Sequence, residues 1–190
     1  FRKGIWLMFN LELDDKDLKK IENLFKKTPN LANQILNSAL RKAINYVTNE
    51  EKKYIQDTYT PDKDLLGVKG LKKQIKSGEA ILFASTKRNH LNKFDSSSKT
   101  PERLRNQHIQ VSIKKGNKTE MRTLFWAFYK TAGKRFSLGL YFRNGEDKNH
   151  ITPARTVSIM QMSAPITEEQ EKKLQEVFTK EIIKSLNKEM

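Results

Sequence analysis

The chain has 190 residues, of which 36% are apolar and 31% are charged, with a formal net charge of +15 and no cysteine. This composition is typical of one globular domain, so we expect residues 1–190 to form a single domain. The absence of cysteine excludes disulfides, thiolate nucleophiles and cysteine-based zinc sites, and no apolar run approaches the roughly 18 residues that cross a bilayer, so no membrane is expected.

The positive charge is concentrated in the middle of the chain. Residues 61–165 hold 21 Lys and Arg against 8 Asp and Glu, whereas residues 1–60 hold 11 against 8 and residues 166–190 hold 5 against 6. The same boundaries separate helical patterns at the two ends from a strand-like middle. We therefore expect the middle to face an anionic partner, or other subunits that hold it against its own repulsion.

Residues 1–27 are predicted to form an N-terminal extension and a first helix. Asp14 and Asp15 are suitable helix caps, and Thr28-Pro29 ends the pattern. The helix carries an apolar stripe at helical spacing, formed by Leu18, Ile21, Leu24 and Phe25.

Residues 28–59 are predicted to form one long helix, with Thr28 as N-cap and Pro29 at the first helical position. Leu36, Leu40, Ala43 and Val47 mark its buried face. At about 1.5 Å per residue the helix would be roughly 40 Å long, which is long for a compact domain of this size. It is expected either to pack partly on another chain or to lie across its own sheet.

Residues 60–165 are predicted to be basic and rich in β-strands. Residues 72–76 and 80–85 form two strands joined by a tight turn at Ser77-Gly78. Residues 86–108 then form a polar loop with 6 basic against 2 acidic residues. Such a loop is either a charged solvated segment or a contact surface.

Further strands follow the loop. Residues 109–113 alternate in polarity, turn at Lys115-Gly116-Asn117 and are predicted to pair with residues 121–129. The second of these is apolar on both faces, so it should lie centrally or against a neighbouring subunit. Residues 138–143 form another strand that turns at Asn144-Gly145, and residues 150–162 an extended arm.

Residues 166–190 are predicted to form a C-terminal amphipathic helix that starts at a capping box of Thr167 and Gln170. Its apolar face consists of Leu174, Val177, Phe178, Ile182 and Leu186. The predicted class is α+β, with a long N-terminal helix, a mostly antiparallel sheet carrying a basic loop, and a closing helix.

No catalytic, cofactor or metal site is predicted. The histidines at 90, 108 and 150 lack metal-ligand spacing, and neighbouring carboxylates such as Glu50 and Glu51 are adjacent in sequence, which places them about 100° apart on a helix. We therefore predict that the chain is not an enzyme.

The basic middle supplies candidate contact residues for phosphate groups or an acidic protein. They are Lys87, Arg88, Lys93, Arg103 and Arg105 in the loop, with Arg155 in the arm. Phe94 lies among them and is a candidate for stacking on a nucleic-acid base. The alternative is a charged loop without a partner.

Several segments resemble the prophage minor tail protein Z family. The sequence Leu-Tyr-Phe-Arg-Asn-Gly at 140–145, the proline-containing segment 151–162 and a final amphipathic helix resemble the end of that family. Residues 37–43 resemble the start of its long helix, and residues 81–94 its strand and following Leu-x-x-Phe element. The prolines usual before Leu91 and after Ile159 are missing.

The resemblance implies a structural protein that completes the head-proximal end of the tail in a phage or phage-tail-like particle. It implies that the protein is made in the bacterial cytoplasm and becomes part of the particle as a homo-oligomeric ring, hexameric by analogy. The ring would dock on tail terminator, tube or neck proteins, and genomic DNA would pass through it. Expected lateral contact residues are Phe125, Trp126, Phe128, Val157 and Ile159. The alternatives are a sequence-nonspecific nucleic-acid-binding protein and, third, a nucleic-acid-processing enzyme.

Overall fold

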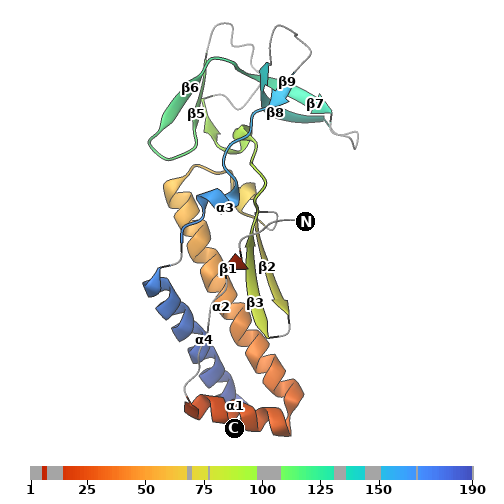
Figure 1. Cartoon of the computed structure of the whole chain (residues 1–190), viewed down its shortest axis with the longest axis vertical. Helices are drawn as coiled ribbons and strands as arrows, with labels where there is room; N and C mark the ends of the chain where they lie inside the picture. The colour runs from red at the N-terminus through yellow and green to blue at the C-terminus, as the bar shows by residue number, and fades with distance from the viewer. Residues whose placement is uncertain are drawn as a thin grey trace.

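The computed structural model describes residues 6–7, 15–67, 70–76, 78–97, 108–130, 136–143, 151–165 and 167–189. These residues form an elongated molecule with two parts (Figure 1). A body contains the long helices and a β-hairpin at their side, and a head contains two small antiparallel sheets. The predicted α+β class is confirmed.

The helices of the body begin and end close to the predicted residues. Helix α1 spans Asp15–Lys27 and helix α2 spans Pro29–Thr58, with the Thr28 carbonyl accepting hydrogen bonds from the N–H groups of Leu31 and Ala32. The buried face of α2 is built on residues such as Ile35, Ala39, Leu40, Ala43 and Val47. Leu36, predicted for this face, is only half-buried.

Helix α4, Glu168–Glu189, lies along α2 in the body (Figure 1). Its start is the predicted capping box, because the Gln170 N–H donates to Thr167 Oγ1 at 3.3 Å and the Thr167 N–H donates to Gln170 Oε1 at 3.0 Å. Its buried residues recur every four positions, at Leu174, Phe178, Ile182 and Leu186. The α2 face therefore packs within its own chain, against α4 and the hairpin.

The hairpin consists of β2, Leu71–Lys76, and β3, Glu79–Ala84, as predicted to within a residue. Gly78 has φ of +79° in the turn, a backbone conformation that glycine adopts without steric cost. Strand β1, Trp6–Leu7, pairs with β3 on its other edge, so the sheet order is β1-β3-β2. Leu82 of β3 is buried in the core that the hairpin shares with α2.

The first sheet of the head differs from the prediction. Strand β5, Ile109–Ser112, pairs with β6, Lys118–Met121, and not with the apolar strand after it. The predicted turn is present, with φ of +77° at Gly116, but the chain pairs directly after it, so that Met121 lies opposite Ile109, the first residue of β5. Strand β4, Asp95–Ser96, covers the other edge of β5.

The second sheet has the order β7-β8-β9, formed by Leu124–Lys130, Phe136–Arg143 and Ile151–Pro153. Strand β7 was expected to be central or covered by a neighbouring subunit. Within the sheet that the structure describes it is an edge strand, paired only with β8 in a register that sets Trp126 opposite Leu140.

The polar loop predicted for residues 86–108 contains a packed element. Residues 91–93 form a short 3₁₀ turn, η2 (Leu91–Lys93), and both Leu91 and Phe94 are buried, at 2% and 4% exposed. The suggestion that Phe94 stacks on a base is therefore wrong, because its ring belongs to the core and its backbone bridges Pro61. The turn at Asn144-Gly145 lies outside the described residues.

The predicted extended arm ends in a short helix. After β9 the chain forms α3, Ile159–Met162, where Ser158 and Gln161 make a capping box. Ile159 is 0% exposed and packs in the core of its own chain. Its assignment as a lateral contact residue is corrected accordingly, because no surface of this side chain is left for a neighbour.

A bend of the chain before the hairpin joins the two parts. The 3₁₀ turn η1, Lys63–Leu66, leads to Gly70, whose N–H donates to the Gly67 carbonyl and whose carbonyl accepts from the Ser85 N–H. The head is fixed to the end of α2 by hydrogen bonds from Thr60 N–H to the Ile113 carbonyl and from Lys115 N–H to the Thr58 carbonyl.

Candidate functional site

Two segments that connect the head to the body are paired with each other through their backbones. The Leu91 N–H donates to the Ala154 carbonyl at 2.9 Å, and the Thr156 N–H donates to the Asn89 carbonyl at 2.8 Å. The Asn89 side-chain amide adds a bond to the Val157 carbonyl at 2.8 Å. This pairing fixes the loop after β3 against the arm after β9.

The pairing brings together basic side chains from both segments. His90 and Arg155 form a backbone bridge, and the positive charges of Arg155, Lys87 and Lys93 act on the His90 imidazole. We call Lys87, His90, Lys93 and Arg155 the junction cluster. Three of the residues predicted for an anionic partner therefore lie at one place in the structure.

The electrostatics of the junction cluster favour an anion. His90 is exposed as a residue, but partial desolvation of its ring lowers its pKa, and the charges of Arg155, Lys87 and Lys93 lower it further. Asp62 lies 3.5 Å from Lys93 and compensates one of the three cations. A phosphate or carboxylate placed here would be stabilised by the remaining charges and would raise the pKa of His90 in return.

The other predicted contact residues do not belong to the junction cluster. Arg88 is exposed and follows Lys87 in the chain. Arg103 and Arg105 lie outside the described residues. Val157 is half-buried, and its carbonyl accepts the bond from Asn89.

The aromatic residues of β7 differ in their exposure. Phe125 is half-buried, with the Arg143 guanidinium 5.1 Å from the centre of its ring. Trp126 is half-buried, and its Nε1 is buried without an acceptor among the described residues. Phe128 is 64% exposed. Of the three, Phe128 offers the most surface to a partner.

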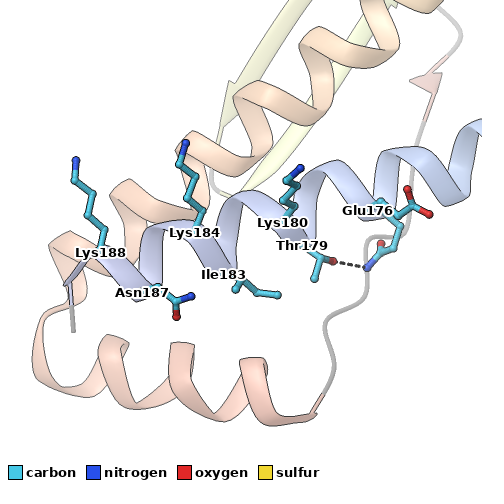
Figure 2. A pocket seen from close by; sticks show the side chains of 8 residues that line it. Glu176, Thr179, Lys180, Ile183, Lys184, Asn187 and Lys188 are labelled. Carbon is cyan, nitrogen blue, oxygen red and sulfur yellow. Dashed lines mark hydrogen bonds between the residues drawn. The ribbon is translucent and has the colours of Figure 1, made fainter.

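The outer face of α4 was missed by sequence reasoning. It borders an open cavity of about 900 Å³ lined by Gln175, Glu176, Thr179, Lys180, Ile183, Lys184, Asn187 and Lys188. Ile183 and Asn187 point toward α1, whereas the lysines point to the opposite side (Figure 2). The spacing of four between the lysines was visible in the sequence, but it is equally typical of a solvated helix face.

One buried carboxylate belongs to the body and not to the junction cluster. Glu51 of α2 is 4% exposed, and its Oε2 has no hydrogen-bond partner among the described groups. Burial raises the pKa of Glu51, although the Ser163 side chain and the Ala164 backbone, which hydrogen-bond it, lower the pKa in part. A cavity of about 10 Å³ beside it has room for about one water molecule.

We expect Glu51→Gln to stabilise the fold at pH 7 by on the order of 1 kcal/mol, because the buried charge is removed while an oxygen acceptor remains. Since the pKa of Glu51 is raised in the folded chain, the cost of its charge grows as pH rises from the unfolded pKa to the folded pKa and is complete above the folded pKa. Below the unfolded pKa, about 4.3, the difference between the two proteins should vanish. Thermal unfolding between pH 4 and 7 measures this, with Glu50→Gln as the control; a variant less stable than the parent at pH 7 would contradict the assignment.

The described parts of the chain offer neither a metal site nor a membrane-spanning helix. These residues contain no group of three or more His, Asp or Glu that could hold a metal ion. None of their helices is long and apolar enough to cross a membrane.

Comparison of the chain with models of known protein families, with curated proteins and with solved structures gives no match.

Proposed function

We propose that this chain is a noncatalytic structural protein that completes the head-proximal end of a phage or phage-like tail. In this role it docks the tail to neck or tube subunits as part of a homo-oligomeric ring. The observation that carries the proposal is the junction cluster, which gathers charge at the connection between the head and the body.

The position of the cluster suits docking. Its side chains are held on paired backbone segments, so an anionic partner bound there would contact the head and the body together. Acidic side chains of a neck or tube protein, or the phosphates of DNA passing through the ring, supply suitable charge. The family resemblance of residues 30–188 favours the first, with DNA as an additional contact.

A ring requires two different lateral faces on each subunit, and it closes when the rotation between neighbours divides a full turn. The elongated shape supplies two long sides (Figure 1). The hexameric number rests on the family resemblance alone. Mass measurement of the chain with and without tube or neck subunits would test self-association. Both conditions are needed because a subunit of this kind can stay monomeric until it binds the proteins on which the ring assembles.

The variant Lys87→Glu/Arg155→Glu is expected to reduce the yield of assembled tails at least tenfold, because two cations of the cluster become anions facing an anionic partner. The matched control is Lys72→Glu/Lys76→Glu, which makes the same charge change on exposed positions of β2. Both should unfold at temperatures close to that of the parent, since all four side chains are exposed or outside the core. Equal yields from the two variants, counted by electron microscopy, would remove the cluster from the docking surface.

Sequence-nonspecific nucleic-acid binding is the alternative that the cluster also favours. Three cationic contacts to phosphates would give a slope of about −3 for the logarithm of affinity against the logarithm of salt concentration. Duplex binding of this kind by a monomer, with normal tail assembly by the Lys87→Glu/Arg155→Glu variant, would favour this alternative over docking.

A further inference from the structure

Strand β7 has one edge that no strand of the described chain covers. It is seven residues long, and its hydrogen-bonded pairing is with β8 alone. Alternate backbone N–H and C=O groups of an edge strand point away from the sheet and can bond to another extended chain. A long apolar edge of this kind is a place where proteins add a strand from a partner.

The side chains of β7 continue the apolar face of the sheet beyond the core. Leu124, Trp126 and Phe128 share one face, because side chains alternate along a strand. Leu124 is buried and Trp126 is half-buried, but Phe128 is 64% exposed, the most exposed large apolar side chain among the described residues. An added strand with an apolar side chain beside Phe128 would remove this surface from water.

The charges around β7 select the kind of strand that fits. Just before β7 the described residues include Lys118, Glu120 and Arg122, and its partner strand β8 ends at Arg143. Glu120 already lies 3.9 Å from Arg122 and 3.7 Å from His108. Arg122, in the turn before β7, is exposed, and the Arg143 guanidinium lies over the ring of Phe125. A second copy paired through the same edge would bring its own Arg122 and Arg143 toward these like charges, so an acidic segment fits this edge better.

We propose that the free edge of β7 binds an extended acidic segment of a partner protein, which joins the sheet as an additional antiparallel or parallel strand. Backbone hydrogen bonds hold the segment, an apolar side chain covers Phe128, and carboxylates face Arg122 and Arg143. This inference goes beyond the docking role of the junction cluster, because it assigns a second surface and the chemistry of its partner. Either assignment can fail while the other holds.

The test uses the whole chain and a fluorescent peptide of alternating valine and glutamate. We expect micromolar binding by fluorescence anisotropy. Two matched peptides are expected to bind at least tenfold more weakly: one with lysine in place of glutamate, and one N-methylated at two adjacent central residues. The second removes a backbone donor toward β7 in either register while it keeps the charge.

The protein variants separate this edge from general attraction. Phe128→Glu should weaken binding at least tenfold, whereas Tyr54→Glu, at a 41% exposed aromatic residue of α2, should change it less than threefold. The Lys87→Glu/Arg155→Glu variant should also stay within threefold, which distinguishes the edge from the junction cluster. Circular dichroism melts show whether each variant is folded.

Three results would overturn the proposal. Equal binding of the glutamate and lysine peptides would remove the charge argument, and unchanged binding by a folded Phe128→Glu would remove the site. Self-association of the parent that Phe128→Glu abolishes, measured by light scattering without peptide, would show that a second copy occupies the edge.

Discussion

Ile182→Ala is expected to lower the free energy of unfolding by about 3 to 4 kcal/mol, one of the largest effects of a single change in this chain. Ile182 is 0% exposed and lies in the face of α4 that packs on α2. Truncation removes buried methyl groups and leaves a cavity that two long helices cannot close. The expected fall in Tm is roughly 10 °C for a chain of this length, measured by calorimetry.

The neighbouring Ile183 provides the control. It has the same side chain and stands on the same helix, but it is 36% exposed and points toward α1 (Figure 2). Ile183→Ala is expected to change the free energy of unfolding by less than about 1 kcal/mol, partly because alanine favours the helix. Equal losses from the two variants would mean that α4 does not pack on α2 through the face described above.

Gly70→Ala is expected to cost about 2 to 3 kcal/mol, because the added methyl group has no room. A Cβ at this position would overlap the backbone carbonyl oxygen of Leu65 and lie 3.2 Å from Cγ1 of Ile159. The backbone is held on both sides, by the bond from Gly70 N–H to the Gly67 carbonyl and by the bond from Ser85 N–H to the Gly70 carbonyl. Neither neighbour can move without loss of a hydrogen bond or of core packing.

Gly67→Ala tests whether this cost comes from the close approach or from glycine in general. A Cβ at Gly67 meets only the Asp64 carbonyl oxygen, at 3.3 Å, so a small shift accommodates it. Urea unfolding should give a loss of less than about 1 kcal/mol for Gly67→Ala. If Gly70→Ala is as mild as this control, the contact between the bend, the hairpin and α3 is looser than described.

The elements with local signals were predictable from the sequence. Pro29 at the first helical position, the Thr167 and Gln170 capping box and the turn at Gly78 each depend on residues close together in the chain. The apolar face of α4 was also visible as a repeat of helical period. In these parts the side chains that determine the structure are near neighbours in sequence.

The strand pairing of the head was not predictable in the same way. The sequence favoured pairing of residues 109–113 with residues 121–129, since the second segment is the more apolar. The turn at Gly116 was predicted correctly, but the chain pairs directly after it, so β5 has a shorter and more polar partner and β7 pairs with β8. Which strands pair depends on loop closure and on packing between distant segments, and these leave no local signal.

The candidate site was likewise predictable only in part from the sequence. Residue type alone selected Lys87, Lys93 and Arg155, but their meeting around His90 depends on the backbone pairing of Asn89 and Leu91 with the arm. Phe94 shows the converse, because an aromatic residue among basic residues was interpreted as exposed and is part of the core. Charged residues in a sequence are enough to predict an exposed surface, whereas the burial of an aromatic residue among them is known only from the fold.

The most direct test of the proposed tail function is electron microscopy of intact tails or tail-like particles assembled with this chain. The proposal predicts density for this subunit in a ring at the head-proximal end of the tail, with the junction cluster facing a neighbouring subunit or DNA. Particles that are complete and functional without the subunit, or a subunit located away from the tail and neck, would contradict it.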